Sequence, residues 1–177
     1  MLISSPAKAW DEIGTEEDRR KVMPAFVYPM IAFCGLSTFV GSLLGIGISA
    51  QAFQIALTNS CAVFVALFGS YFLVAYLANK YGTKVLGRPN ESALCLQFVG
   101  HSMTVIFVLS FITGLFPSFL ILQLMLQLYV VYIVWEGARH LMHVPDKNLM
   151  MYTIFISFSL IVAPMVIRWI FNRLLFQ

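Results

Sequence analysis

Two long stretches without a charged side chain constrain this chain more than any other feature. No Asp, Glu, Lys or Arg occurs in the 58 residues from Val22 to Asn79, or in the 44 residues from Ser92 to Trp135. Charged residues make up 11% of the 177-residue chain, against about 25% in an ordinary soluble domain. Water-facing helices and strands do not tolerate such runs, so the sequence predicts an integral membrane protein.

The lengths of the apolar runs predict the number of membrane spans. A bilayer core about 30 Å thick needs about 20 apolar residues per helix, so each charge-free stretch holds two spans and 148–167 holds a fifth. The runs lack the alternation of a membrane β-barrel. We therefore expect an all-α fold, a polytopic bundle of five transmembrane helices at about 25–44, 53–79, 93–116, 118–141 and 149–171. Residues 1–23 would form a cytoplasmic amphipathic segment, and 24–177 the transmembrane domain.

The distribution of basic residues predicts the orientation of the bundle. With five spans, nine basic residues fall on one side: Lys8, Arg19, Arg20, Lys21, Lys80, Lys84, Arg88, Arg139 and Lys147. Only Arg168 and Arg173 fall on the other. By the positive-inside rule the N-terminus is cytoplasmic and the C-terminus is not. The connectors around 45–52 and 114–118 are short and uncharged, which predicts two helical hairpins.

The N-terminal segment carries signals for one short helix. Ser5-Pro6 is a favourable helix start and Gly14 a natural stop. Trp10 and Ile13, three residues apart, share a face of this helix. One interpretation makes them an interfacial anchor with Trp10 at headgroup level; the other packs them against the loops.

Small residues on the first span predict a close helix contact. Ser37, Gly41 and Gly45 recur every four residues, a spacing that lets another backbone approach. The second span repeats the pattern at Thr58, Ala62, Ala66 and Gly69. These ridges indicate either a tight helix pair within the chain or a dimerisation face. Pro24 and Pro29 should kink the start of the first span.

Polar residues within the third span form the first candidate site. Gln97, His101 and Thr104 share one helix face, and ionisable groups inside a membrane are costly enough to suggest a role. His101 is either hydrogen-bonded to a neighbouring helix or part of a proton or ion site.

A longer polar stripe follows the fourth span, at Tyr129, Tyr132, Glu136, His140 and His143. The spacings of three and four residues place them on one helix face. Glu136, His140 and His143 could ligate zinc or another divalent cation, although the spacing is not the zinc-protease pattern. Otherwise Glu136 reaches water or pairs with a basic residue at the cytoplasmic end.

The known signatures of catalysis do not occur in this sequence. It has no phosphate-binding Gly-Lys loop and no Gly-x-Ser-x-Gly elbow. No Asp lies inside a predicted span. The three cysteines lie in spans without a CxxC spacing, which indicates neither a disulfide framework nor a thiolate metal site. We therefore expect a protein that is not an enzyme and that needs no cofactor.

Several segments resemble bacterial members of the Yip (Ypt-interacting-protein) domain family. They are Ser5-Pro6-Ala7-Lys8-Ala9-Trp10-Asp11-Glu12-Ile13, Tyr28-Pro29, Leu128-Tyr129-Val130-Val131-Tyr132, Gly137-Ala138-Arg139-His140 and His143-Val144-Pro145. The resemblance implies a five-helix membrane domain with a cytoplasmic N-terminus. Eukaryotic members act in vesicle traffic and bind small GTPases, but their Asp-Leu-Tyr-Gly motif and Gly-Tyr pair are missing here, so GTPase binding is not carried over.

Two functional hypotheses follow. The first is a non-enzymatic membrane scaffold or organising protein, in the bacterial inner membrane, that acts through helix packing, oligomerisation and contacts with lipids or a cytoplasmic protein. Lys80, Lys84 and Arg88 would either contact anionic headgroups or only set the topology. The second is a small transporter or channel with a polar path through His101 and Glu136. Nucleic acid is not an expected partner.

Overall fold

The computed structural model describes residues 6–15 and 23–175, and the regular structure within those ranges is helical. The elements in order are α1 (Pro6–Thr15), the π-helical turn η2 (Met23–Val27), α2 (Tyr28–Ile46), α3 (Ala50–Val85), α4 (Ser92–Ser102), α5 (Thr104–Leu115), the 3₁₀ turn η3 (Pro117–Phe119), α6 (Leu120–Gln127), α7 (Tyr129–His140) and α8 (Asp146–Leu175). The all-α prediction is confirmed, as is a short helix directly after Ser5.

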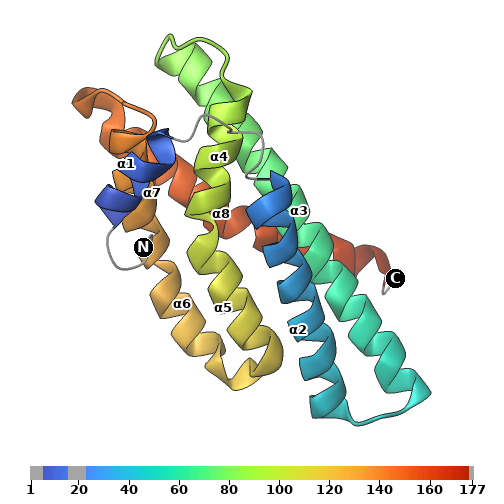
Figure 1. Ribbon diagram of the computed structural model, residues 1–177. Coiled ribbons are helices and arrows are strands. Elements are labelled where there is room, and N and C mark those ends of the chain that lie inside the picture. Colours follow the sequence, from blue (N-terminus) through green and yellow to red (C-terminus); the bar gives the residue numbers. More distant parts are fainter. Residues whose placement is uncertain (1–5, 16–22, 176–177) are drawn as a thin grey trace.

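The long helices run up and down between two ends of the molecule. The α2–α3 and α5–α6 connectors lie at one end, while α1 and the α3–α4 and α7–α8 connectors lie at the other (Figure 1). Helix α8 crosses behind the rest and packs against α3 and α7. The two hairpins expected from the short uncharged connectors are therefore present. We call the end that holds α1 the α1 end.

Within the described residues, three helices are long and apolar enough to cross a membrane: Pro24–Ile46, Ala50–Val85 and Asp146–Leu174. The pair α4 and α5 makes a fourth candidate, bent by 42°. Helices α3 and α8 are longer than the expected spans. Helix α3 continues past Lys80, and α8 includes Asp146 and Lys147 at its start and Arg173 near its end. The fourth expected span, 118–141, is divided among η3, α6 and α7, so the count of five stays a prediction.

Two helix breaks fall inside expected spans. Helix α4 ends at Ser102 and α5 begins at Thr104, and a similar break at Leu128 separates α6 from α7. At the start of the first span the backbone takes a π-helical turn at Met23–Val27 before α2. This irregular turn contains Pro24 and directly precedes α2, which holds Pro29 near its start. The two prolines remove two backbone donors, and the sequence predicts a kink here.

The small-residue ridge of α2 packs against α5. A side chain at Gly41 would collide with the backbone carbonyl of Gly114, and one at Gly114 would collide with Ser37. A Cβ added at Gly45 would have no neighbour within 4 Å, so the close contact between α2 and α5 ends before this residue. The ridge at Ser37 and Gly41 is thus used within the chain, where it brings α2 and α5 together.

The ridge of α3 also contacts other helices. Ala62 and Ala66 are buried. Gly69 lies against Ile167 of α8, since a Cβ added at this glycine would lie 3.1 Å from the Ile167 Cδ1. Ser60, on the α2 side, donates a hydrogen bond of 2.8 Å to the carbonyl of Gly35. Helix α3 therefore joins α2 on one face to α8 on another.

Candidate functional site

Helix α1 is docked onto α7 through one tryptophan. Trp10 is 0% exposed, and its indole N–H donates a hydrogen bond of 3.1 Å to the carbonyl of Ile133. Its ring lies 5.6 Å from that of Phe98 and fills the space left by Gly137, where a Cβ would come within 2.6 Å of the indole. Glycine is needed at this position because the indole occupies the place of a side chain.

This position differs from the headgroup anchor that one interpretation of Trp10 predicts. An indole that is buried between α4 and α7 cannot contact lipid headgroups. Ile13 is also partly buried against the core. The helix is bound by helices of its own chain rather than by loops, because Gly137 and Phe98 offer the tryptophan an apolar site with a carbonyl at its end.

The polar residues of α4 face α1 and η2. Gln97 is buried, and its side-chain amide donates a hydrogen bond of 3.2 Å to the carbonyl of Ile13. The His101 ring stacks on Phe26 at 5.3 Å and meets Trp10 edge-on at 6.2 Å. In residues 6–15 and 23–175 neither ring nitrogen of His101 has a hydrogen-bond partner. Thr104, the third residue of this face, donates a bond of 2.6 Å to the backbone of His101.

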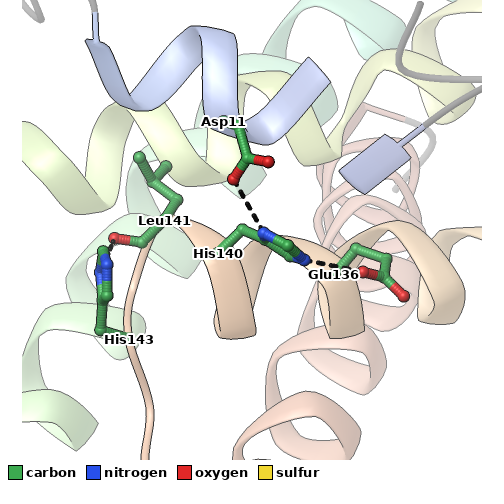
Figure 2. A network of polar contacts seen from close by, with 5 residues as sticks. All are labelled: Asp11, Glu136, His140, Leu141 and His143. Atoms are coloured by element: carbon green, nitrogen blue, oxygen red, sulfur yellow. Dashed lines mark hydrogen bonds and ion pairs between the residues drawn. The ribbon is translucent and has the colours of Figure 1, made fainter. Parts of the chain in front are cut away.

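The stripe on α7 is centred on His140. Its Nδ1 lies 2.8 Å from Oδ1 of Asp11 on α1, and its Nε2 lies 3.4 Å from Oε2 of Glu136 one turn earlier (Figure 2). The rings of Tyr129 and Tyr132 continue the stripe, 5.6 Å apart. The imidazole therefore bridges two carboxylates and connects α1 to α7 a second time.

His143 does not join the other members of this stripe. Helix α7 ends at His140, and His143 has a left-handed backbone with φ 46°. Its Nδ1 contacts the carbonyl of Leu141 at 3.1 Å, and its ring lies away from Glu136 and His140 (Figure 2). The described part of the chain holds no group of three His, Cys, Asp or Glu placed to bind a metal. Of the expected ligands, Glu136 and His140 meet, but His143 lies apart from them, so the three do not form one site.

Apolar rings separate the two polar stripes. Trp10 packs against both His101 and Gly137, so the indole stands between the α4 residues and the α7 residues. His101 faces inward among aromatic rings, whereas His140 is partly exposed beside Asp11. A path from His101 to Glu136 would have to pass this indole, and the transport hypothesis stays a prediction.

Two basic residues, one in the α3–α4 connector and one near the end of α3, have local partners. Arg88 donates a hydrogen bond to the backbone carbonyl of Met142 and lies 3.7 Å from Glu91. Lys80 lies over the ring of Tyr76, with 5.4 Å between Nζ and the centroid. Arg88 thereby fastens this connector to the segment that follows α7.

Two features escape the sequence reasoning. The partner of His140 on α1, Asp11, is 129 positions away. The second feature is a cavity of about 650 Å³ that opens between α2, α3, α5, α6 and α8, lined in part by Gln127 and Arg168. A signal was present in the sequence, because Gln123 and Gln127 repeat at a helical spacing inside an apolar run.

The fold and the buried polar contacts define a helical membrane protein with a short amphipathic helix docked on its bundle. The Yip1 domain matches residues 1–167, which include α1. The chain therefore belongs to the Yip1 domain family, whose members are generally non-enzymatic proteins of membrane trafficking. Neither a curated protein nor a solved structure matches the chain.

Proposed function

We propose that this Yip1-domain protein is a non-enzymatic membrane scaffold whose working surface is the α1 end. The observation that carries the proposal is the docking of α1, with Trp10 buried and Asp11 beside His140. Docking places α1 beside α7, at the end of the molecule that also holds the α3–α4 and α7–α8 connectors (Figure 1). A cytoplasmic protein or anionic headgroups would meet one continuous polar surface there.

The charges of the chain support this assignment. Among the residues at the α1 end are Lys80, Lys84 and Arg88 together with Asp11 and Glu91. Such a mixed surface suits a protein partner or the headgroups of an anionic leaflet, where each basic residue contributes on the order of 1 kcal/mol. By contrast, the α2–α3 connector at the other end has no charged residue.

The proposal includes a topology. Five spans, with the N-terminus and the α1 end in the cytoplasm and the C-terminus outside it, follow from the nine-to-two distribution of basic residues. A bacterial inner membrane is the proposed location. Lipids are the constant partners. A homo-oligomer would need a surface other than the ridge at Ser37 and Gly41, because α5 already covers that ridge.

Site-directed labelling tests the topology. Cys61→Ser first removes the exposed native thiol. A cysteine is then placed either at Lys84, near the α1 end, or at Ile48, which is 99% exposed on the α2–α3 connector. A membrane-impermeant maleimide added to intact cells should label the Ile48→Cys variant and not the Lys84→Cys variant. The reverse labelling would contradict the cytoplasmic α1 end.

Crosslinking and flux test the scaffold itself. A photo-crosslinking residue at Lys84 should capture a protein or lipid more often than one at Ile48, and Trp10→Ala should reduce that capture by releasing α1. Reconstituted vesicles should show no proton or cation flux above empty vesicles. A flux that His101→Phe and Glu136→Gln abolish would refute the scaffold and show a transporter.

A further inference from the structure

The cavity described above lies toward the end of the bundle opposite α1. Its volume is about 650 Å³, within the range of about 300–1,000 Å³ that is usual for small-molecule sites. Five helices each contribute one face, and Pro164, Arg168 and Asn172 supply the face of α8 at successive turns. The faces of α2 and α8 both line the cavity although they come from opposite ends of the transmembrane sequence.

Several polar side chains face this cavity without a protein partner. Gln127 is only 7% exposed, yet its amide makes no hydrogen bond within the described residues. Gln123, one turn earlier on α6, and Asn172 on α8 are likewise without a hydrogen bond there. A buried amide that lacks a partner carries a desolvation cost, which a ligand with hydrogen-bonding oxygens would remove.

The charge of the cavity is positive and uncompensated. Arg168 lines it, and no carboxylate in residues 6–15 or 23–175 lies within ion-pair distance of this guanidinium. All eight acidic residues of the chain precede position 147, and the described ones lie toward the α1 end. Arg173, five residues further on, is instead positioned over the ring of Trp169 at 5.6 Å. Arg168 is thus the cation that is free to bind an anion.

Part of the remaining lining is apolar, while Thr38, Ser42, Asn59, Ser110 and Thr113 add polar side chains to it. Val63 and Leu67 of α3 and Ile106 of α5 form an apolar wall of the cavity and are almost fully buried in the bundle. A ligand that satisfies the whole cavity has an anionic group for the guanidinium, oxygens for the amides and a hydrocarbon segment for this wall. On the cytoplasmic side of membranes, basic pockets between transmembrane helices bind the headgroups of anionic phospholipids, and the same pairing of guanidinium and phosphate is available in this cavity.

We propose that the cavity binds one anionic phospholipid, with its phosphate on Arg168, its ester oxygens near the amides of Gln127 and Asn172, and the upper part of an acyl chain along Val63, Leu67 and Ile106. The planar guanidinium suits a phosphate because it donates two parallel hydrogen bonds. The site lies away from the proposed cytoplasmic surface, so its occupancy and the scaffold role can be tested separately.

Native mass spectrometry of the purified full-length chain tests this site. Delipidated protein in detergent is titrated with phosphatidylglycerol or with phosphatidylcholine of the same acyl chains. We expect one phosphatidylglycerol per chain, bound about tenfold more tightly than phosphatidylcholine, because only the former offers an unneutralised phosphate. Arg168→Gln should remove this preference. Arg173→Gln makes the same charge change on the same helix and should leave the preference within about twofold.

Two further arms keep the test decisive. Gln127→Leu, on α6, should weaken the binding of both lipids and keep the preference for phosphatidylglycerol. If thermal unfolding shows that Arg168→Gln is misfolded, Gln127→Leu replaces it as the probe of the cavity. Millimolar glycerol phosphate should not displace the lipid, since it lacks the acyl chain. Equal affinity for the two lipids, equal effects of the two arginine variants, no effect of Gln127→Leu, or displacement by glycerol phosphate would each overturn the lipid site.

Discussion

Adding one methyl group at Gly137 should weaken the docking of α1 on the bundle. The Cβ of an alanine there would lie 2.6 Å from the indole of Trp10 and 2.7 Å from the ring of Phe98. Both rings are rigid and fully buried, so they must move by most of an ångström to reach ordinary contact distance. Overpacking of this kind costs about 1–3 kcal/mol, and the upper half of that range applies because two rings are displaced.

Two terms lie outside the docking equilibrium. The helix propensity gained when alanine replaces glycine, up to about 1 kcal/mol, acts on α7, which is helical whether or not α1 is docked. The collision with Phe98 likewise persists when α1 leaves, so the loss in the docking free energy of α1 is the part of the cost that falls on Trp10, about 1–2 kcal/mol or a factor of about 5–30 in the opening equilibrium. The ten residues of α1 are too few for a stable isolated helix, so the protection of their amides depends on docking.

Hydrogen exchange of the α1 amides measures this loss directly. In Gly137→Ala these amides should exchange about 5–30 times faster than in the wild type, while the amides of α3 stay unchanged. Gly82→Ala is the matched control, because it also adds a methyl group inside a helix but meets no atom within 4 Å. The reasoning would be refuted if the α1 amides of Gly137→Ala exchange at the wild-type rate. It would also be refuted if Gly82→Ala accelerates their exchange as much as Gly137→Ala does.

Four other substitutions, one of them a control, probe the remaining contacts. Gly41→Ala should lower stability by about 3 kcal/mol or more, because its Cβ meets backbone that cannot rotate away, whereas Gly45→Ala, with open space around it, should have an unfolding midpoint at or above that of the wild type. Asp11→Asn should accelerate exchange of α1 by less than about fivefold, since its contact with His140 is largely exposed; a larger acceleration would show that this pair, and not Trp10, holds α1. His143→Gly should raise the thermal midpoint slightly by relieving a left-handed backbone, and a clear drop would mean that the contact of the ring with the backbone outweighs that strain.

Hydropathy predicts the helices of this chain because the spacing of apolar runs is a local property. The start of α1 at Pro6 and the hairpin connectors follow from nearby residues in the same way. The breaks at Met103 and Leu128 do not, since neither position has a proline or glycine and both lie within the charge-free stretch from Ser92 to Trp135. Such bends are determined by the helices packed around them rather than by the local sequence.

The candidate site was harder to predict because its contacts join distant positions. The spacing of Glu136 and His140 places them together on α7, and they do meet at 3.4 Å. The same spacing rule failed for His143, because α7 ends before it. Trp10 was recognisable as amphipathic, but only the fold shows that Gly137 leaves room for its indole.

The distance along the chain between Trp10 and its acceptor also orders the assembly of the protein. Ile133 is 123 positions later, and a ribosome adding about 5–20 residues per second needs about 6–25 s to reach it. During that interval the indole has no site in the bundle, and the headgroup region of the bilayer is the environment that an amphipathic ring prefers. The first helix to be synthesised is thus among the last to reach its final position. A chain that terminates before α7 keeps α1 undocked, exposed to proteases and recognisable as incomplete.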